Sequence, residues 1–220
     1  MSDIDAYKTL SAAAESLYKE KGSKFIGYLF PIQSIEQFEQ ELIKIKKAHP
    51  KARHWCYAYK IGPEAKVYRV NDDGEPSGTA GKPIYGQLNS AEITDVACVV
   101  VRYFGGTKLG ASGLIRAYKI ATQDAVQQIQ IITKWITEDI TIHFDYGLMG
   151  TLLKALKDLK LDLAESDFGA TPNLTLKVKQ SELDHTIKRI KAKLLHRSVE
   201  DIEEDTNVEG IQFKPTKGTI

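Results

Sequence analysis

The chain has 220 residues, of which 42% are hydrophobic and 27% are charged. This length suggests one or two domains, and the composition is ordinary for a globular protein, which excludes global disorder. Lys and Arg number 30 and Asp and Glu number 29, so the formal net charge is +1. That balance excludes a generally cationic nucleic-acid coat, and any basic function must be local.

Three features predict a cytoplasmic protein. The two cysteines, Cys56 and Cys98, lie outside any CxxC or CxxH pair and cannot build a disulfide framework, which fits a reducing compartment. The first residues carry Asp3 and Asp5 and lack an apolar core, so no signal peptide is expected there. The longest apolar run, residues 96–101, has the length of a strand and falls far short of the roughly 18 residues of a membrane span.

The first part of the chain predicts strands around one amphipathic helix. Residues 24–30 are apolar and aromatic and predict a strand, and Ser34 is expected to cap a helix that ends before Pro50. Residues 53–61 alternate strictly between two faces, as a strand does, and residues 66–70 are expected to be the hairpin partner.

A long irregular segment and a glycine-rich turn stand out in the middle of the chain. Residues 71–83 are so rich in Gly, Pro and Asx that we expect neither a helix nor an interior strand. Loops of this length are uncommon inside compact domains and are often functional. Residues 96–104 then predict a strand buried on both faces, followed by a glycine-rich turn at residues 105–113 and a helix over residues 112–130.

The last part of the chain predicts the element order β-α-β-β-α-β, which is that of a ferredoxin-like plait. The expected elements, in chain order, are a strand at residues 140–144, a helix at 148–159, strands at 161–168 and 174–178, a helix capped by Ser181 that runs to residue 195, and a strand at 199–204. We therefore predict an α+β chain with a first domain over residues 1–132, a ferredoxin-like domain over 133–208 and a tail over 209–220.

Basic residues gather around the glycine-rich turn. Glycines such as Gly105, Gly106 and Gly110 let backbone amides approach a ligand, and the N-terminus of the next helix adds partial positive charge. The candidate ligands of an anion or a nucleic acid are Arg102, Lys108, Ser112, Arg116, Lys119 and Lys82. The alternative is a strand-to-helix connection whose glycines serve only backbone geometry and packing.

The acidic residues of the long loop have two possible uses. Asp72, Asp73 and Glu75 offer oxygen ligands for a hard cation, but they lack the alternating spacing of an EF-hand. We therefore predict no metal site. The carboxylates are better suited to pair with Arg or Lys of the glycine-rich turn and to hold its shape.

An aromatic row lies on one face of the strand over residues 53–61. An exposed face carrying Trp55, Tyr57 and Tyr59 would be a stacking platform for bases. The alternative, which we favour, is that these rings line the core.

The sequence contains no recognisable catalytic constellation or cofactor motif. Pro76 and Pro83 stand where a Walker loop needs Gly and Ser or Thr. Cys56 shares a strand face with His54, but nothing places an orienting carboxylate beside them. The five histidines show no metal-ligand spacing. We therefore predict no cofactor and favour a non-catalytic protein.

Two glycine-rich strings, residues 72–84 and 99–110, resemble the signature of the YigZ/Impact family and occur in the right order and spacing. The resemblance covers residues 15–130 as an Impact N-terminal domain. The remainder resembles the small C-terminal domain of the bacterial members, which is similar to the last domain of elongation factor G. The resemblance implies a first domain like the second domain of ribosomal protein S5, with a four-stranded sheet and helices on one face.

The same resemblance implies a role in translational regulation. The eukaryotic relatives restrain a stress kinase through its activator protein, and we expect that role not to carry over, because it uses a recruitment domain outside these 220 residues. We expect a protein that binds RNA, the ribosome or a translation-related protein. Two alternatives stay open: a protein-interaction adaptor that docks through the long loop and the aromatic face, and an enzyme acting on a phosphorylated small molecule.

Overall fold

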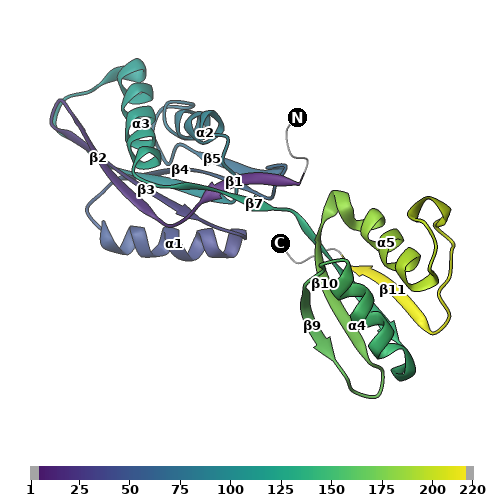
Figure 1. Cartoon of the computed structure of the whole chain (residues 1–220). Helices are drawn as coiled ribbons and strands as arrows, with labels where there is room; N and C mark the ends of the chain where they lie inside the picture. Colours follow the sequence, from purple (N-terminus) through teal and green to yellow (C-terminus); the bar gives the residue numbers. More distant parts are fainter. Residues whose placement is uncertain (1–4, 217–220) are drawn as a thin grey trace. The chain divides into compact units, whose positions relative to one another are not determined.

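The computed structural model describes residues 5–216, which form two compact units (Figure 1). The first unit contains residues 6–134, and the second contains Asp5 and the residues from Trp135 onward. The sheets of both units are antiparallel, and the α+β class expected from the sequence is confirmed.

The first unit is built on a five-stranded antiparallel sheet with the order β2-β3-β6-β4-β5. The central strand, β6, is buried along almost its whole length, because its continuous run of small and β-branched residues has no polar side. The strands are β2 (Ala14–Glu20), β3 (Ser23–Pro31), β4 (His54–Ile61), β5 (Val67–Asn71) and β6 (Val96–Tyr103).

Helices cover both faces of this sheet. In Figure 1, α1 (Ile35–Ala48) lies on one side, and α2 (Gly81–Ser90) and α3 (Gly110–Gln127) lie on the other. The four-stranded sheet with helices on one face, implied by the family resemblance, is therefore wrong. The physical reason is that β3, β4 and β6 carry apolar side chains on both faces, so each face needs a cover.

Several elements of the first unit were not predicted from the sequence. The strand β2 lies at the edge of the sheet and has a mixed polar sequence. Its exposed side chains break the apolar alternation by which a strand is recognised in a sequence. A small two-stranded sheet of β1 (Ala6–Leu10) and β7 (Ile131–Trp135) was also missed. The helix α2 begins inside the segment expected to be irregular. Pro83 is compatible with this helix because it lies in the first turn, where backbone amides have no partner within the helix.

The second unit has the element order β-α-β-β-α-β, as expected, and an antiparallel sheet in the order β11-β8-β10-β9. Its helices pack their apolar residues on the sheet, where Leu152, Leu156 and Ile190 join the core formed by the strands. The elements are β8 (Thr137–Phe144), α4 (Met149–Asp158), β9 (Leu163–Asp167), β10 (Asn173–Lys179), α5 (Leu183–Leu195) and β11 (Ile211–Thr216).

The closing strand of this sheet lies in the segment predicted to be a tail. The expected strand at residues 199–204 instead contains the 3-10 turn η3 (Val199–Asp201), and β11 pairs with β8 in its place. The sequence of β11 gives a weak strand signal, because its apolar alternation is short and because it contains Pro215. An edge strand tolerates a proline, since one of its sides makes no hydrogen bonds to a neighbouring strand. Residues 217–220 of the predicted tail, like residues 1–4 of the predicted first domain, lie outside the described residues.

The start of α5 also differs from the prediction. The helix begins at Leu183 after a 3-10 turn, and Ser181 does not cap it. Instead, the Ser181 amide donates to the Asp5 carboxylate at 2.9 Å, and the Ser181 hydroxyl bonds to the same carboxylate. No helix within residues 5–216 is long and apolar enough to span a membrane.

We expect β11 to be required for the stability of the second unit. Ile211 is 4% exposed and packs into the core, so Ile211→Ala should lower the free energy of unfolding by about 2–5 kcal/mol. Urea denaturation followed by circular dichroism measures the loss. Gln212→Ala, at the exposed neighbouring position, is the control and should change stability little. Equal stability of Ile211→Ala and the wild type would contradict the assignment of β11 to the core.

Candidate nucleic-acid interface

The glycine-rich turn between β6 and α3 packs its backbone against the tip of the β2–β3 hairpin. The Gly105 amide donates to the Ser23 hydroxyl at 3.1 Å. A Cβ on Gly105 would lie 1.9 Å from the carbonyl carbon of Gly22, which no side chain tolerates. Gly106 and Gly110 have φ values of +89° and +72°, which favour glycine. The glycines therefore bring two turns into direct contact.

The start of α3 leaves its first amides free of side-chain caps. The helix is 18 residues long, and its N-cap residue Leu109 makes no side-chain hydrogen bond. The first amides of a helix have no partner within it and carry the positive end of the helix dipole. Lys108, Ser112, Arg116 and Lys119 are all exposed around this helix start. The structure thus brings four of the candidate ligands to one turn and the first turns of one helix.

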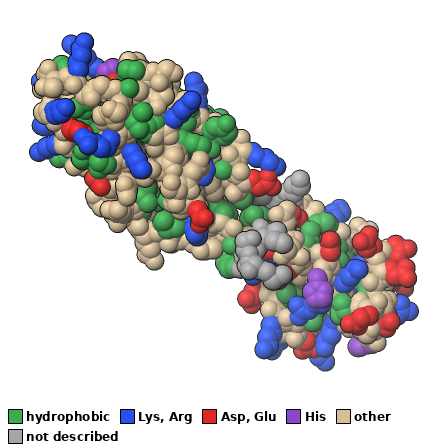
Figure 2. Space-filling view, turned by 90° about the horizontal axis from the view of Figure 1, so that it is seen from above, with side chains coloured by type: hydrophobic (Ala, Val, Ile, Leu, Met, Phe, Trp, Pro, Cys, Tyr) green, Lys and Arg blue, Asp and Glu red, His purple; other side chains and the backbone are tan. Residues whose placement is uncertain are grey.

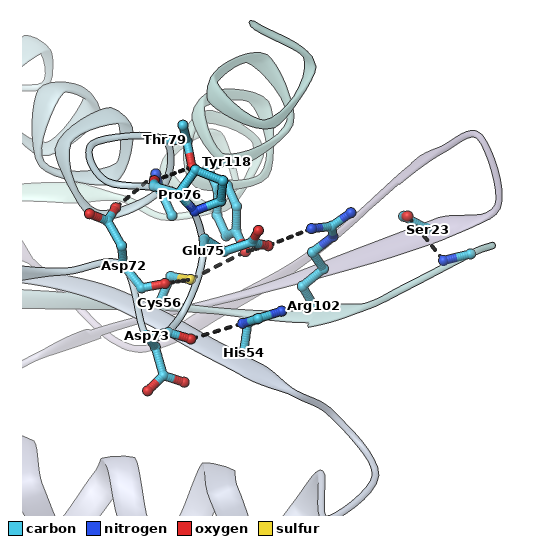
Figure 3. Close-up of polar contacts among 12 residues, drawn as sticks. Ser23, His54, Cys56, Asp72, Asp73, Glu75, Pro76, Thr79, Arg102 and Tyr118 are labelled. Atoms are coloured by element: carbon cyan, nitrogen blue, oxygen red, sulfur yellow. Dashed lines mark hydrogen bonds and ion pairs between the residues drawn. The ribbon is translucent and has the colours of Figure 1, made fainter. Parts of the chain in front are cut away.

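Arg102 does not belong to this exposed group. Its guanidinium lies 2.6 Å from the Glu75 carboxylate, and the two side chains are 7% and 3% exposed (Figure 3). The Tyr118 hydroxyl of α3 donates to the same carboxylate oxygen at 2.8 Å. Arg102 is therefore a core residue that ties the long loop to β6 and α3. Lys82 also stands apart from the helix start of α3, because it lies in the first turn of α2, where it is exposed.

The acidic residues of the long loop organise the loop itself. The Asp72 carboxylate accepts hydrogen bonds from the amides of Gly78, Ala80 and Gly81 at 2.8–3.0 Å. The Asp73 carboxylate accepts from the amide of Trp55 at 2.7 Å. Together with the Glu75–Arg102 pair, these contacts shape the loop. Within residues 5–216, no group of three or more His, Cys, Asp or Glu side chains is placed to hold a metal ion.

The electrostatics of Asp72 favour its charged form. Burial alone would raise the pKa of the Asp72 carboxyl, but the three amide hydrogen bonds and nearby Lys82 outweigh burial and hold its pKa below the ordinary value of 3.8. Hydrogen bonds to a carboxylate stabilise the ionised form in this way. The ionised carboxylate is therefore part of the folded loop.

Cys56 is not placed as a nucleophile. Its thiol is buried and lies 3.0 Å from the Asp72 carbonyl oxygen and 3.2 Å from the Tyr118 hydroxyl (Figure 3). Burial raises the pKa of the Cys56 thiol, so the thiolate that nucleophilic catalysis requires is disfavoured at neutral pH. His54, on the same face, is occupied at Nδ1 by the Asp73 carbonyl oxygen at 2.8 Å.

The aromatic row of β4 is covered by α1 and offers no stacking platform. Tyr57 and Tyr59 are 8% and 4% exposed, and their ring centroids lie 4.7 and 4.8 Å from that of Phe38 in α1. Trp55, at the end of the row, is half-buried, and the Lys46 ammonium lies 5.4 Å from its ring. The favoured interpretation, that these rings line the core, therefore holds for Tyr57 and Tyr59.

Further basic residues next to the turn were not predicted from the sequence. Lys19, Lys21 and Lys24 are exposed on the β2–β3 hairpin, whose tip contacts Gly105. Figure 2 shows Lys and Arg side chains gathered at the left end of the first unit. The sequence does show a dense run of lysines around Gly22. Because β2 was not predicted, there was no reason to expect this run near the glycine-rich turn.

We expect the removal of one partner of the Glu75–Arg102 pair to destabilise the first unit strongly. Arg102→Met would leave Glu75 buried without its counterion and should reduce the free energy of unfolding by roughly 3–5 kcal/mol, measured by urea denaturation. The double variant Glu75→Gln/Arg102→Met is the control: it removes both charges, keeps an acceptor for Tyr118 and should recover most of the loss. A single variant as stable as the wild type would contradict the prediction.

Asp72 should make the stability of the loop pH-dependent. Because its folded pKa is lowered, its contribution is complete above the ordinary value of 3.8 and is lost as the pH falls through the folded value. Asp72→Asn should therefore destabilise the protein near neutral pH by roughly 1.5–3 kcal/mol. The difference from the wild type should shrink below pH 3.8, as followed by thermal denaturation across pH. A difference that stays constant with pH would be inconsistent with an ionised Asp72.

Comparisons with known proteins place the chain in a family. The Impact N-terminal domain matches residues 21–126. The IMPACT family member YvyE of Bacillus subtilis (strain 168) is 34% identical over 179 residues, covering 81% of this chain and 82% of that relative. YigZ of Escherichia coli (strain K12) is 32% identical over 164 residues, covering 73% of this chain and 80% of that relative.

A solved structure described as that of a hypothetical protein also matches. It has a TM-score of 0.65 and 28% sequence identity, and the alignment covers 92% of this chain and all of the other. The resemblance found in the two glycine-rich strings is thereby confirmed. The chain belongs to the IMPACT family.

Proposed function

We propose that this protein is a non-catalytic, translation-associated regulator that binds RNA, the ribosome or a translation-related protein. Its binding site is the exposed start of α3, with Lys108, Ser112, Arg116 and Lys119. One observation carries the proposal: an uncapped helix N-terminus opens beside these exposed side chains, and residues 105–119 contain no acidic residue. The Glu20 carboxylate of β2 pairs with Arg116, which leaves Lys108 and Lys119 as the cations offered to a ligand. Backbone amides and cations in this arrangement suit phosphate groups.

The setting in translation rests on the family. The sequence resemblance implies translational regulation, and membership of the IMPACT family supports it. A ribosomal partner would place the action of the protein in the cytoplasm. The net charge of +1 limits non-specific attraction, because affinity from phosphates grows with the number of basic contacts, so binding would depend on this local site.

Ribosome co-sedimentation at low and moderate salt tests the proposal. The wild type should pellet with ribosomes in a salt-sensitive manner, and Lys108→Ala/Lys119→Ala should lose most of the pelleted fraction, because two exposed cations are removed at the helix start. Arg102 is left intact, since its removal would disturb the core.

The matched control is Lys154→Ala/Lys157→Ala, which removes two exposed cations from α4 and should pellet as the wild type does. Equal pelleting of the α3 variant and the wild type would refute the site. Absence of wild-type pelleting at both salt concentrations would refute ribosome binding and favour a protein partner, to be sought by affinity capture.

A further inference from the structure

We propose that the first unit carries a second basic surface, on the side of its sheet that α1 covers, and that this surface binds the phosphate backbone of double-stranded RNA. We call it the α1-side surface, and its residues are Lys19, Lys24, Lys46, Lys51 and Arg53. The choice of RNA rests on the proposed function. The inference deepens that function, because it names the class of RNA and a binding surface separate from the start of α3.

The strand register places the hairpin lysines on the α1 side of the sheet. Lys19 lies opposite Lys24 in the β2–β3 pair, and Lys24 lies opposite Tyr103 in the β3–β6 pair. Residues directly opposite each other in antiparallel strands share one face. The Tyr103 hydroxyl is hydrogen-bonded to Nδ1 of His49, the C-cap residue of α1, at 2.9 Å. Both lysines therefore lie on the face covered by α1, and both are exposed.

His49 fixes the segment that joins α1 to β4. Its Nε2 is hydrogen-bonded to the Tyr28 hydroxyl at 2.6 Å, and its Nδ1 is hydrogen-bonded to the Tyr103 hydroxyl. Both ring nitrogens are thus tied to strands of the sheet. The connecting segment that follows His49 carries Lys51 and Arg53, which are exposed. The two hydrogen bonds therefore hold this basic segment beside the end of β6.

Lys46 adds a third segment to the α1-side surface. It lies in the last turn of α1 and is exposed, and its ammonium lies 5.4 Å from the ring centroid of Trp55. Trp55 packs on the core cluster that α1 covers. The surface therefore combines cations from the β2–β3 hairpin, from the end of α1 and from the connection to β4.

The positive charge of this surface is not neutralised by the protein. Residues 19–24 and 46–53 together hold seven Lys and Arg residues and one acidic residue, Glu20. Glu20 is paired with Arg116 of α3, on the other side of the sheet. None of the five residues of the α1-side surface forms an ion pair with another residue in the described range 5–216. Lys19 and Lys24 even face each other, which destabilises a strand pair and would be relieved by an anionic ligand.

Acidic side chains bound the surface on one side. Glu15 of β2 and Glu41 of α1 line a hollow between these two elements on the α1 side of the sheet. Glu41 is paired with Lys44 at 2.6 Å, so Glu15 is the carboxylate that would repel phosphates there. The RNA would therefore be confined to the end of the sheet where the hairpin and the connecting segment lie.

The lack of a free aromatic face favours a duplex over a single strand. Proteins that bind single strands stack the bases on exposed aromatic rings. On the α1-side surface, Trp55 is half-buried beside Lys46, and Tyr103 is half-buried and held by His49. A duplex instead offers a dense row of phosphates, one charge per about 1.7 Å of its axis, and double-stranded RNA is recognised largely through its backbone. Cations without a stacking platform suit that ligand.

Fluorescence anisotropy with a labelled RNA duplex of about 16 base pairs, the length that a double-strand-binding domain covers, tests the inference. The wild type should bind the duplex more tightly than either of its single strands. Lys19→Ala/Lys24→Ala should weaken binding about tenfold or more at about 0.1 M salt. It should also make the slope of log affinity against log salt shallower by about 1.8, since each duplex phosphate contact contributes about 0.9. Its melting temperature should not fall, because a like-charge pair is removed.

A second variant and a matched control accompany this measurement. Lys51→Ala/Arg53→Ala removes two exposed cations from the connecting segment and should weaken duplex binding in the same way. Lys154→Ala/Lys157→Ala makes the same change in net charge on α4 and should bind as the wild type does. Polyglutamate, added at the same concentration of negative charge as unlabelled duplex, should displace the labelled duplex far less well.

The outcomes separate this inference from the proposed function. Absence of duplex binding, wild-type affinity in both folded α1-side variants, or equal binding of the single strands would overturn the inference. Efficient displacement by polyglutamate would also overturn it and indicate an acidic protein partner. Duplex binding lost only in Lys108→Ala/Lys119→Ala would overturn it while leaving the proposed function intact. Duplex binding through the α1-side residues without ribosome pelleting would support the inference and refute ribosome association.

Discussion

The buried ion pair between Glu75 and Arg102 is the interaction on which the first unit depends. Two charges removed from water carry a large desolvation cost, which is offset only by close pairing and further hydrogen bonds. Here the pairing distance is 2.6 Å, and Tyr118 adds a hydrogen bond to the same carboxylate. The pair joins the long loop, the central strand and α3, which are separated along the chain, and it also supports the exposed ring of Phe104.

The second constraint is the close approach of two backbones at Gly22 and Gly105. Because no side chain fits between them, the hairpin tip and the glycine-rich turn lie in contact. Each turn carries exposed lysines, but the strand register places Lys19 and Lys24 on the α1 face of the sheet, opposite Tyr103. The glycines of the turn therefore serve the packing of the two backbones. This contact supports the packing interpretation of the glycine-rich turn, and the anion site stays a proposal.

Predictions held where a pattern was long and local, and failed where it was short or depended on distant contacts. The helix α1 and the strand β6 were predicted because amphipathic spacing and a continuous apolar run need only neighbouring residues. The strand β11 lies in the segment predicted to be a tail, because three alternating positions at a sheet edge give a weak signal. The start of α2 was missed because the glycines and prolines that precede it are typical of loops.

The family, the α+β class and the order of most elements could be predicted from the sequence, because these follow from motifs and periodicities within short stretches of chain. Which of the candidate residues face solvent depends on the tertiary fold. It buried Arg102 against Glu75 and the Tyr57 and Tyr59 rings beneath α1, and it brought the tip of the β2–β3 hairpin against Gly105. Exposure is a property of contacts between residues far apart in the chain, and no local pattern encodes it.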